Sequence, residues 1–548
     1  MLVSFFIFNF LIINLLGFSY LYKIFYEKIV TKKKNTIYIQ NNDIIYGIFF
    51  LILILLIAHF LFPIKILVIP IFFIGTISFI YLVLKKKIKL DFLKLNLIFI
   101  FFLIFINSTN GPTYDTQLYH HQILNWNFYD KISLNLTLIE DRYGMISPWQ
   151  LLLSIGNFKI FDSYVSCLFN FLPIIVIINY FLIEKDKVNV SSIFLKLSIL
   201  FIFLYSLIHP FNNGIIFMHL GSLGTDLASM IFFILSVYSF LKDFEDKDSD
   251  YYNQVLIFST ITIFCRISYL PIILLPLFIL VKKKNFIKYF RINLLISFLY
   301  ILWFVRSILN NGCLIYPFKY SCLNLDNFIS LERVEQYSNI VKSFARTAPK
   351  YINFMNLDYS IYSFKWFAPW LKEYFLKSSL TQISLTLSLL FVIPFFIKIL
   401  RNKNSQNVIF VLIVFFLNFM LWLQAPDIRF AFGLLISIPV LFISVAIPKN
   451  FSLINNSILK TSFILILIAL FFKNINHYEE ITKKNIFIRN YDVEGFKIIN
   501  NFDNYKIVIN DKNQRFCYDT KYICVLNDEI NFKIRKNYFG YKKFIEID

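Results

Sequence analysis

The residues best suited to chemistry lie in a polar stretch, 107–147, which separates strongly apolar segments. Asp115 stands near its start, and His120 and His121 follow closely. A carboxylate beside an apolar surface can have a raised pKa and act as a general base. Asp is also a favoured N-cap of a helix, and a helix could begin just after Asp115. Both roles remain open for this residue.

The two histidines are adjacent, so on a helix their side chains point about 100° apart and cannot easily serve one site. One of them, with Asp115 and a second acid, could bind a divalent cation. No second Asp stands two positions from Asp115, as an Asp-x-Asp metal motif would require. Histidines that are solvated or anchor the loop are therefore the competing interpretation.

Further along the same stretch, Glu140, Asp141 and Arg142 form a charged run. Such a run can be a surface turn whose charges pair with one another. It can also bring a second catalytic acid and a substrate-binding arginine close to Asp115. The sequence does not separate these two interpretations.

Arginines and one further acid lie in or beside apolar segments, at Arg266, Arg306, Arg429 and Asp226. Ionisable groups within a membrane are costly, which makes them candidates for function. The planar guanidinium group suits phosphate oxygens. Arg429 could instead pair with Asp427, and Arg306 could extend to the membrane interface. Asp226 opens an apolar segment, so it either caps that helix or belongs to a site.

The composition indicates how these residues are held. The chain has 548 residues, of which 58% are hydrophobic and 16% are charged. Soluble domains are nearer half apolar and a quarter charged, so a water-soluble fold is excluded. The net charge of +21 does not indicate nucleic-acid binding, because much of the Lys lies in short runs at the ends of apolar segments.

Apolar segments long enough to cross a bilayer recur along the chain. The first begins without a preceding positive region, so we expect a membrane helix and not a cleaved signal peptide. The segment 254–281 is too long for one untilted helix and contains Arg266 and Pro271, which predicts a hairpin of two short helices. With it, we expect about 12–14 spans; the others lie near 2–22, 44–62, 66–84, 92–107, 164–183, 191–209, 221–241, 289–309, 379–400, 408–424, 428–447 and 457–473.

Lys and Arg in the short connections set the orientation, because these residues accumulate on the cytoplasmic side. This assigns 107–147, 310–378, 424–428 and the tail 474–548 to the outer side. Four cysteines fall in the segments assigned to the outer side, in two closely spaced pairs. This spacing is expected of local disulfides, which persist in oxidising compartments. The cysteines are Cys313, Cys322, Cys517 and Cys524.

We therefore predict an all-α polytopic membrane domain over 1–473 and a small domain over 474–548. The tail has short alternating runs separated by Asp and Asn, which are typical of strands and turns. A small extracytoplasmic α/β domain is expected there.

Several motifs together resemble a family of bacterial multi-pass membrane proteins of uncharacterised function. They are Tyr-Asp-Thr-x-Leu-Tyr-His at 114–120, Gly-Thr-Asp-Leu-Ala at 224–228, Gly-x-x-x-Tyr-Pro at 312–317, Pro-Asp-x-Arg-Phe at 426–430, and Cys-Tyr-Asp at 517–519. That family is similar in layout to the GT-C glycosyltransferases, which use polyprenyl-phosphate sugars.

The resemblance implies transfer of a sugar from a lipid-phosphate donor at the outer face of the bacterial inner membrane. It makes Asp115 the candidate base and makes Arg266 or Arg429 the candidate phosphate ligands. Many GT-C enzymes have a clearer pair of acids in the first outer loop, and here Glu140 and Asp141 would have to serve. A polysaccharide polymerase or ligase, and a transporter or flippase of lipid-linked glycans, are the alternative functions.

Overall fold

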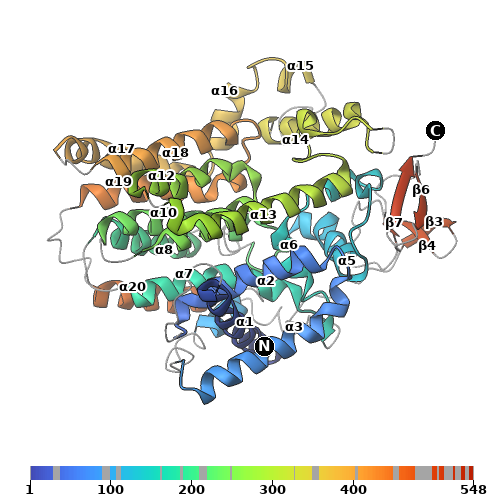
Figure 1. Ribbon diagram of the computed structural model, residues 1–548. Coiled ribbons are helices and arrows are strands. Elements are labelled where there is room, and N and C mark those ends of the chain that lie inside the picture. The colour runs from blue at the N-terminus through green and yellow to red at the C-terminus, as the bar shows by residue number, and fades with distance from the viewer. Residues whose placement is uncertain are drawn as a thin grey trace.

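The computed structural model is a helical assembly in which long apolar helices run side by side (Figure 1). Eight helices of the described residues are long and apolar enough to cross a membrane, and shorter apolar helices accompany them. The protein is therefore membrane-embedded. The structure describes residues 2–28, 38–88, 99–106, 113–160, 163–184, 189–208, 219–246, 250–284, 286–325, 328–347, 357–401, 405–447, 456–475, 496–502, 505–510, 523–524, 532–536 and 542–546.

Helices of the N-terminal half form one side of the assembly in Figure 1, and α17 to α19 form the opposite side. The N-terminal set comprises α1 (Leu2–Tyr26), α2 (Ile44–Ala58), α3 (Ile64–Leu84), α5 (His121–Tyr129), α6 (Pro148–Ser154), α7 (Leu172–Ile183) and α8 (Val190–Ile208). The later helices are α10 (Asp226–Glu245), α11 (Tyr252–Cys265), α12 (Leu274–Lys283), α13 (Phe286–Asn311), α14 (Leu331–Thr347), α15 (Leu357–Ser360), α16 (Phe367–Trp370), α17 (Ser379–Arg401), α18 (Gln406–Trp422), α19 (Phe432–Ala446) and α20 (Asn456–Ile475).

Helix α10 lies in the core of the bundle. It contacts α8, α11 and α19, and nearly all of its side chains are buried. A helix that is apolar around its whole circumference is stable only when other helices surround it. Its first residue, Asp226, is therefore held at a fixed place at one end of the bundle.

The predicted break in the segment 254–281 is confirmed. Helix α11 ends at Cys265, Arg266 has an extended backbone, and a 3₁₀ turn, η7 (Ile267–Ile273), leads into α12. Pro271 lies inside η7 and cannot donate a backbone hydrogen bond, which disfavours a continuous α-helix. The break places Arg266 at the junction between two helices that contact each other.

The tail contains strands in two small sheets. Strand β3 (Phe496–Phe502) pairs antiparallel with β4 (Tyr505–Asn510), which pairs parallel with β5 (Ile523–Cys524). A hairpin joins β6 (Phe532–Lys536) to β7 (Lys542–Glu546). The expected α/β character is not supported, because the described residues after Ile475 form strands and contain no helix. A further two-stranded pair, β1 (Lys159–Ile160) and β2 (Ser163–Tyr164), lies outside the tail.

Of the predicted disulfides, the bond between Cys313 and Cys322 is confirmed. Cys524 is also disulfide-bonded, and Cys517 lies outside the described residues. Cys167 and Cys265 are buried free thiols.

Candidate functional site

Four connections that are far apart in sequence meet at one end of the bundle, and each contributes a charged side chain. Asp115 precedes a π-helical turn, Thr116–His120, and Asp226 begins α10. Arg266 stands between α11 and η7, and Arg429 lies in the 3₁₀ turn η10 (Ile428–Ala431) before α19. Of these residues, Asp115 lies in the segment 107–147 and Arg429 directly follows 424–428, two segments that the Lys and Arg pattern predicts to be on the outer side.

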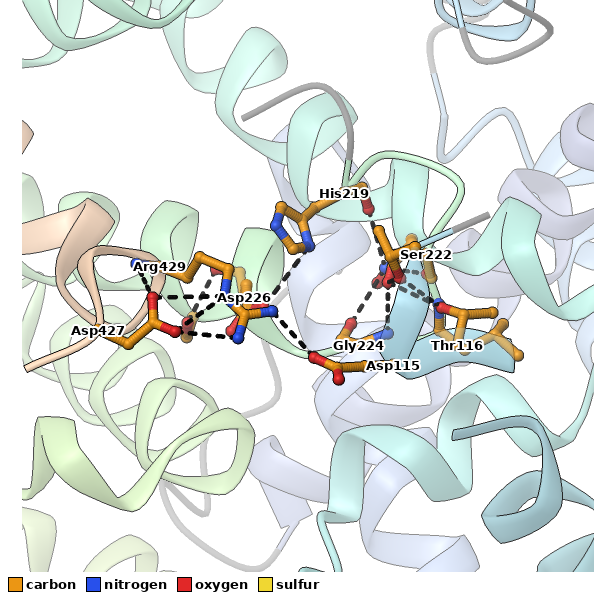
Figure 2. A network of polar contacts seen from close by, with 12 residues as sticks. Asp115, Thr116, His219, Ser222, Gly224, Asp226, Asp427 and Arg429 are labelled. Atoms are coloured by element: carbon orange, nitrogen blue, oxygen red, sulfur yellow. Dashed lines mark hydrogen bonds and ion pairs between the residues drawn. The ribbon is translucent and has the colours of Figure 1, made fainter. Parts of the chain in front are cut away.

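Arg429 connects two carboxylates (Figure 2). Its Nη1 donates to Asp115 Oδ2 across 2.9 Å, and its Nη2 donates to Asp427 Oδ2 across 3.0 Å. Asp427 also accepts the backbone N–H of Arg429 at 2.9 Å, as an N-cap does, and a hydrogen bond from the Tyr374 hydroxyl at 3.3 Å. The pairing of Arg429 with Asp427 expected from the sequence is therefore present, and Asp115 joins it.

Arg266 forms the third ion pair of the site, with Asp226. Nδ1 of His219 lies 3.5 Å from the other carboxylate oxygen of Asp226. The Arg266 guanidinium group also lies 3.9 Å from the centre of the Phe430 ring. Phe430 directly follows Arg429 in the chain. Asp226 is thus both the first residue of α10 and a member of the charged cluster.

The loop before α10 is fastened to the turn that carries Asp115. Thr116 Oγ1 accepts the backbone N–H of Leu223 at 3.1 Å and lies 3.1 Å from Ser222 Oγ. Asn170 donates to the carbonyl oxygens of Ser222 and Gly224. Figure 2 shows Thr116, Ser222 and Gly224 on the Asp115 side of the network. These polar contacts fix the two acidic segments relative to each other.

Two buried nitrogens of the site have no hydrogen-bond partner among the described residues: Nδ1 of His120 and Nε of Arg266. Burial lowers the pKa of His120 to about 4, so its ring is neutral at physiological pH. Unpaired buried polar atoms are costly, so each of these nitrogens is a candidate to contact a ligand. A bound ligand could supply an acceptor to Arg266 and a partner to His120.

The charges of this cluster do not balance. Asp115, Asp226 and Asp427 face two guanidinium groups, and burial also lowers the pKa of His219, which keeps it neutral. Asp427 is held by several donors, whereas Asp115 accepts one hydrogen bond among the described residues. Asp115 is therefore the carboxylate that is most available to contact a ligand.

The charged run of Glu140, Asp141 and Arg142 forms a separate group of contacts. Asp141 accepts from Arg333 of α14 at 3.0 Å, and Glu140 lies 3.9 Å from Arg142. Burial raises the pKa of Glu140 above its ordinary value. The Arg142 guanidinium lies 5.8 Å from the centre of the Tyr119 ring, between this group and Asp115. The turn thus pairs with itself and with α14, and no hydrogen bond between described residues joins it to the Asp115 network.

Two further candidates lie away from the cluster. Arg306 of α13 is buried and donates to His59 Nδ1 at 2.8 Å and to Asn127 Oδ1 at 2.7 Å, so it does not extend to the interface. His121 packs against the Tyr164 ring, 4.4 Å between centroids. The adjacent histidines point in different directions, as helical geometry requires, and only His120 reaches the site.

A divalent-cation site is not apparent. Among the described residues, no group of three or more His, Cys, Asp or Glu side chains could hold a metal ion. The acids of the cluster are instead paired with guanidinium groups.

An apolar groove of about 480 Å³ lies between η7 and α18. Arg266 immediately precedes η7, and Gln424 at the groove lies three residues before Asp427. The groove is therefore close in sequence to Arg266 and to Asp427. Its lining residues are Leu270, Pro271, Ile273, Leu274, Leu417, Met420, Leu421 and Gln424.

Sequence reasoning missed several members of the site. His219 stands seven residues before Asp226, and that closeness was the available signal. The side-chain amide of Asn170 donates to backbone carbonyls, and Ser222 contacts Thr116 through its hydroxyl group. No sequence motif marks such contacts. Tyr374 lies in the long 310–378 loop, where no charge or spacing distinguishes it.

A family model described as "Domain of unknown function (DUF8201)" matches residues 1–436, and the chain belongs to this family. The match includes Asp115, Asp226, Arg266 and Arg429 and ends before the tail. No curated protein and no solved structure matches the chain.

Proposed function

We propose that the protein transfers a sugar from a polyprenyl-phosphate donor to an envelope glycan, lipid or protein at the outer face of the bacterial inner membrane. The observation that supports this most directly is the contact of Asp115 with Arg429, 2.9 Å long, in a cluster that also contains Arg266. It joins a candidate base to candidate phosphate ligands in a membrane-embedded chain.

In the proposed reaction, Asp115 takes the proton of an acceptor hydroxyl group. The acceptor oxygen then bonds to the anomeric carbon of the sugar, and the bond from that carbon to the phosphate oxygen breaks. The lipid phosphate leaves with the bonding electrons, and Arg266 and Arg429 stabilise its charge. Asp115 is suited to this step because one guanidinium bond holds it, whereas Asp427 has several donors.

The apolar groove between η7 and α18 supports a membrane-embedded donor. An isoprenoid chain would lie against Leu270, Leu417 and Met420, with its phosphate near Arg266. The unpaired Nε of Arg266 would donate to a phosphate oxygen, and this contact would offset its present lack of a partner.

Purified protein in proteoliposomes, supplied with a radiolabelled polyprenyl-phosphate sugar and an envelope extract as acceptor, tests the proposal. Asp115→Asn should lower transfer at least about a hundredfold, because general-base catalysis contributes about 10²–10⁴-fold. Asp250→Asn is the matched control: Asp250 is paired with Lys288 and lies past the opposite end of α10 from Asp226. Equal rates for the two variants would contradict the assignment of Asp115.

The broken helix at Arg266 also favours a second candidate, a transporter or flippase of lipid-linked glycans, since transporters often place binding sites at such breaks. Movement of the labelled lipid between leaflets without cleavage of the sugar–phosphate bond would identify that function. Polymerisation of a lipid-linked glycan would instead identify a polymerase or ligase.

A further inference from the structure

Strand β7 of the tail is joined to the first outer loop by backbone hydrogen bonds. The N–H of Leu134 donates to the carbonyl of Lys542 at 2.8 Å, and the N–H of Phe544 donates to the carbonyl of Leu134 at 3.0 Å. The Asn135 side chain adds a bond to the Phe544 carbonyl at 3.1 Å. Leu134 and Asn135, more than 400 positions before β7, thus extend the pairing of the β6–β7 hairpin.

Side chains strengthen the same contact. Phe544 is fully buried, and its ring meets Trp126 of α5 edge to face at 5.7 Å. The Lys542 ammonium group pairs with Asp130 at 2.8 Å and lies 5.2 Å from the centre of the Trp126 ring. The contact of a buried Phe ring with a partly buried Trp ring, combined with an ion pair, makes this a specific docking contact.

The docked strand lies at the far end of the helical stretch that begins beside Asp115. The π-helical turn Thr116–His120 continues directly into α5, and Asp130 follows the last residue of α5. Near that end, Arg306 and His59 hold Asn127. The helical stretch from Thr116 to Tyr129 is thus held by α2 and α13 and also by the tail.

We infer that strand β7 is a positioning element for Asp115: by holding Trp126, Asp130 and Leu134, it fixes the helical stretch that carries the carboxylate to Arg429. The docking itself does not depend on the proposed function, whereas its consequence for sugar transfer does. Phe544 and Lys542 are positioning residues in this arrangement, because they act through α5 and do not contact the cluster.

Hydrogen–deuterium exchange of the full-length protein in detergent tests the docking without reference to activity. Phe544→Ala should raise exchange in peptides covering 126–139 on the order of tenfold, and peptides of α10 and α19 should not change. Lys542→Ala is the milder second variant, with a smaller increase. Lys543→Ala is the matched control, since successive side chains of a strand point to opposite faces.

Swapping the charges of the Lys542–Asp130 ion pair gives a sharper test by hydrogen–deuterium exchange. Lys542→Asp should raise exchange in the same peptides, and combining it with Asp130→Lys should restore protection. In the transfer assay, Lys542→Ala should lower kcat several-fold with an unchanged KM for the donor. Unchanged exchange over 126–139 in both Phe544→Ala and Lys542→Ala would overturn the inference. Altered exchange without any effect on a measurable transfer rate would retain the docking but refute the positioning of Asp115.

Discussion

Arg429 and Asp115 are 314 positions apart in the chain, yet their side chains meet at 2.9 Å. The contact ties the first large loop to the short connection between α18 and α19. Because Arg429 also holds Asp427, one guanidinium group organises two carboxylates from different parts of the bundle. Its removal should therefore affect the fold as well as any chemistry.

Arg429→Met should destabilise the protein by about 3 kcal/mol, because removing one partner of a largely buried ion pair leaves the other charge uncompensated. Here two carboxylates lose their partner. Thermal unfolding in detergent would measure the effect. Combining Arg429→Met with Asp427→Asn should recover part of the loss, since the amide does not carry the unpaired charge.

Lys288→Met is the control for this prediction. Lys288 forms an exposed ion pair with Asp250, and exposed pairs contribute about 0–1 kcal/mol. A destabilisation by Arg429→Met no larger than that of Lys288→Met would contradict the structural role of Arg429.

Acidification should destabilise the protein through its buried histidines. Burial lowers the pKa of His120 from 6.5 to about 4, so the folded state binds fewer protons than the unfolded state between these values. The contribution of the neutral His120 to the free energy of unfolding is then fully present above about pH 6.5 and is lost as the pH falls towards 4. His120→Gln should flatten this part of the profile of unfolding temperature against pH, although His121 and His219 retain their contribution. A variant profile parallel to that of the wild type would argue against a buried, neutral His120.

The sequence predicted the elements better than it predicted the contacts among them. Apolar length and Lys placement marked the membrane helices, and Arg266 with Pro271 marked a real break. Asp115, Asp226, Arg266 and Arg429 were candidates because each charge stands where apolar segments end. Their pairing follows from helix packing across hundreds of positions, which no local pattern encodes. The same limit explains why the partners of Arg306 were not predicted: His59 and Asn127 come from two other segments.

Arg306→Met should reduce stability and leave donor binding unchanged. The substitution removes the hydrogen bonds to His59 Nδ1 and Asn127 Oδ1, and the loss of buried partners costs about 2–3 kcal/mol. Arg306→Lys should be intermediate, because an ammonium group cannot reproduce the planar fork. The exposed Arg291 of the same helix offers a control through Arg291→Met. A raised KM for the donor with normal stability would instead return Arg306 to the binding site.

The Cys313–Cys322 bond should contribute about 2–3 kcal/mol, as expected for a closed loop of about ten residues. Replacing both cysteines with Ser should lower the unfolding temperature, and Cys167→Ala should serve as the comparison for loss of a buried thiol. Thiol trapping in intact cells would also test the orientation. Labelling of Cys313 and Cys322 in untreated cells would place the 310–378 loop in a reducing compartment.

Gly224→Ala should weaken function more than folding. A Cβ at position 224 would lie 3.1 Å from His120 Cε1 and 3.2 Å from Ser222 Oγ, so the imidazole ring would have to move. His120 carries one of the two buried nitrogens that have no partner among the described residues, so its displacement should affect the site. We therefore expect the rate of transfer to fall about tenfold, which corresponds to a rise of about 1.4 kcal/mol in the activation free energy. Gly433→Ala is the matched control, since the atoms nearest to its Cβ would be those of Phe233, at 3.1 Å, and not those of a charged side chain. Gly433→Ala should lower the unfolding temperature at least as much as Gly224→Ala while sparing transfer. If both variants lost activity in proportion to their stability, the tight packing of His120 against Gly224 would have no functional role.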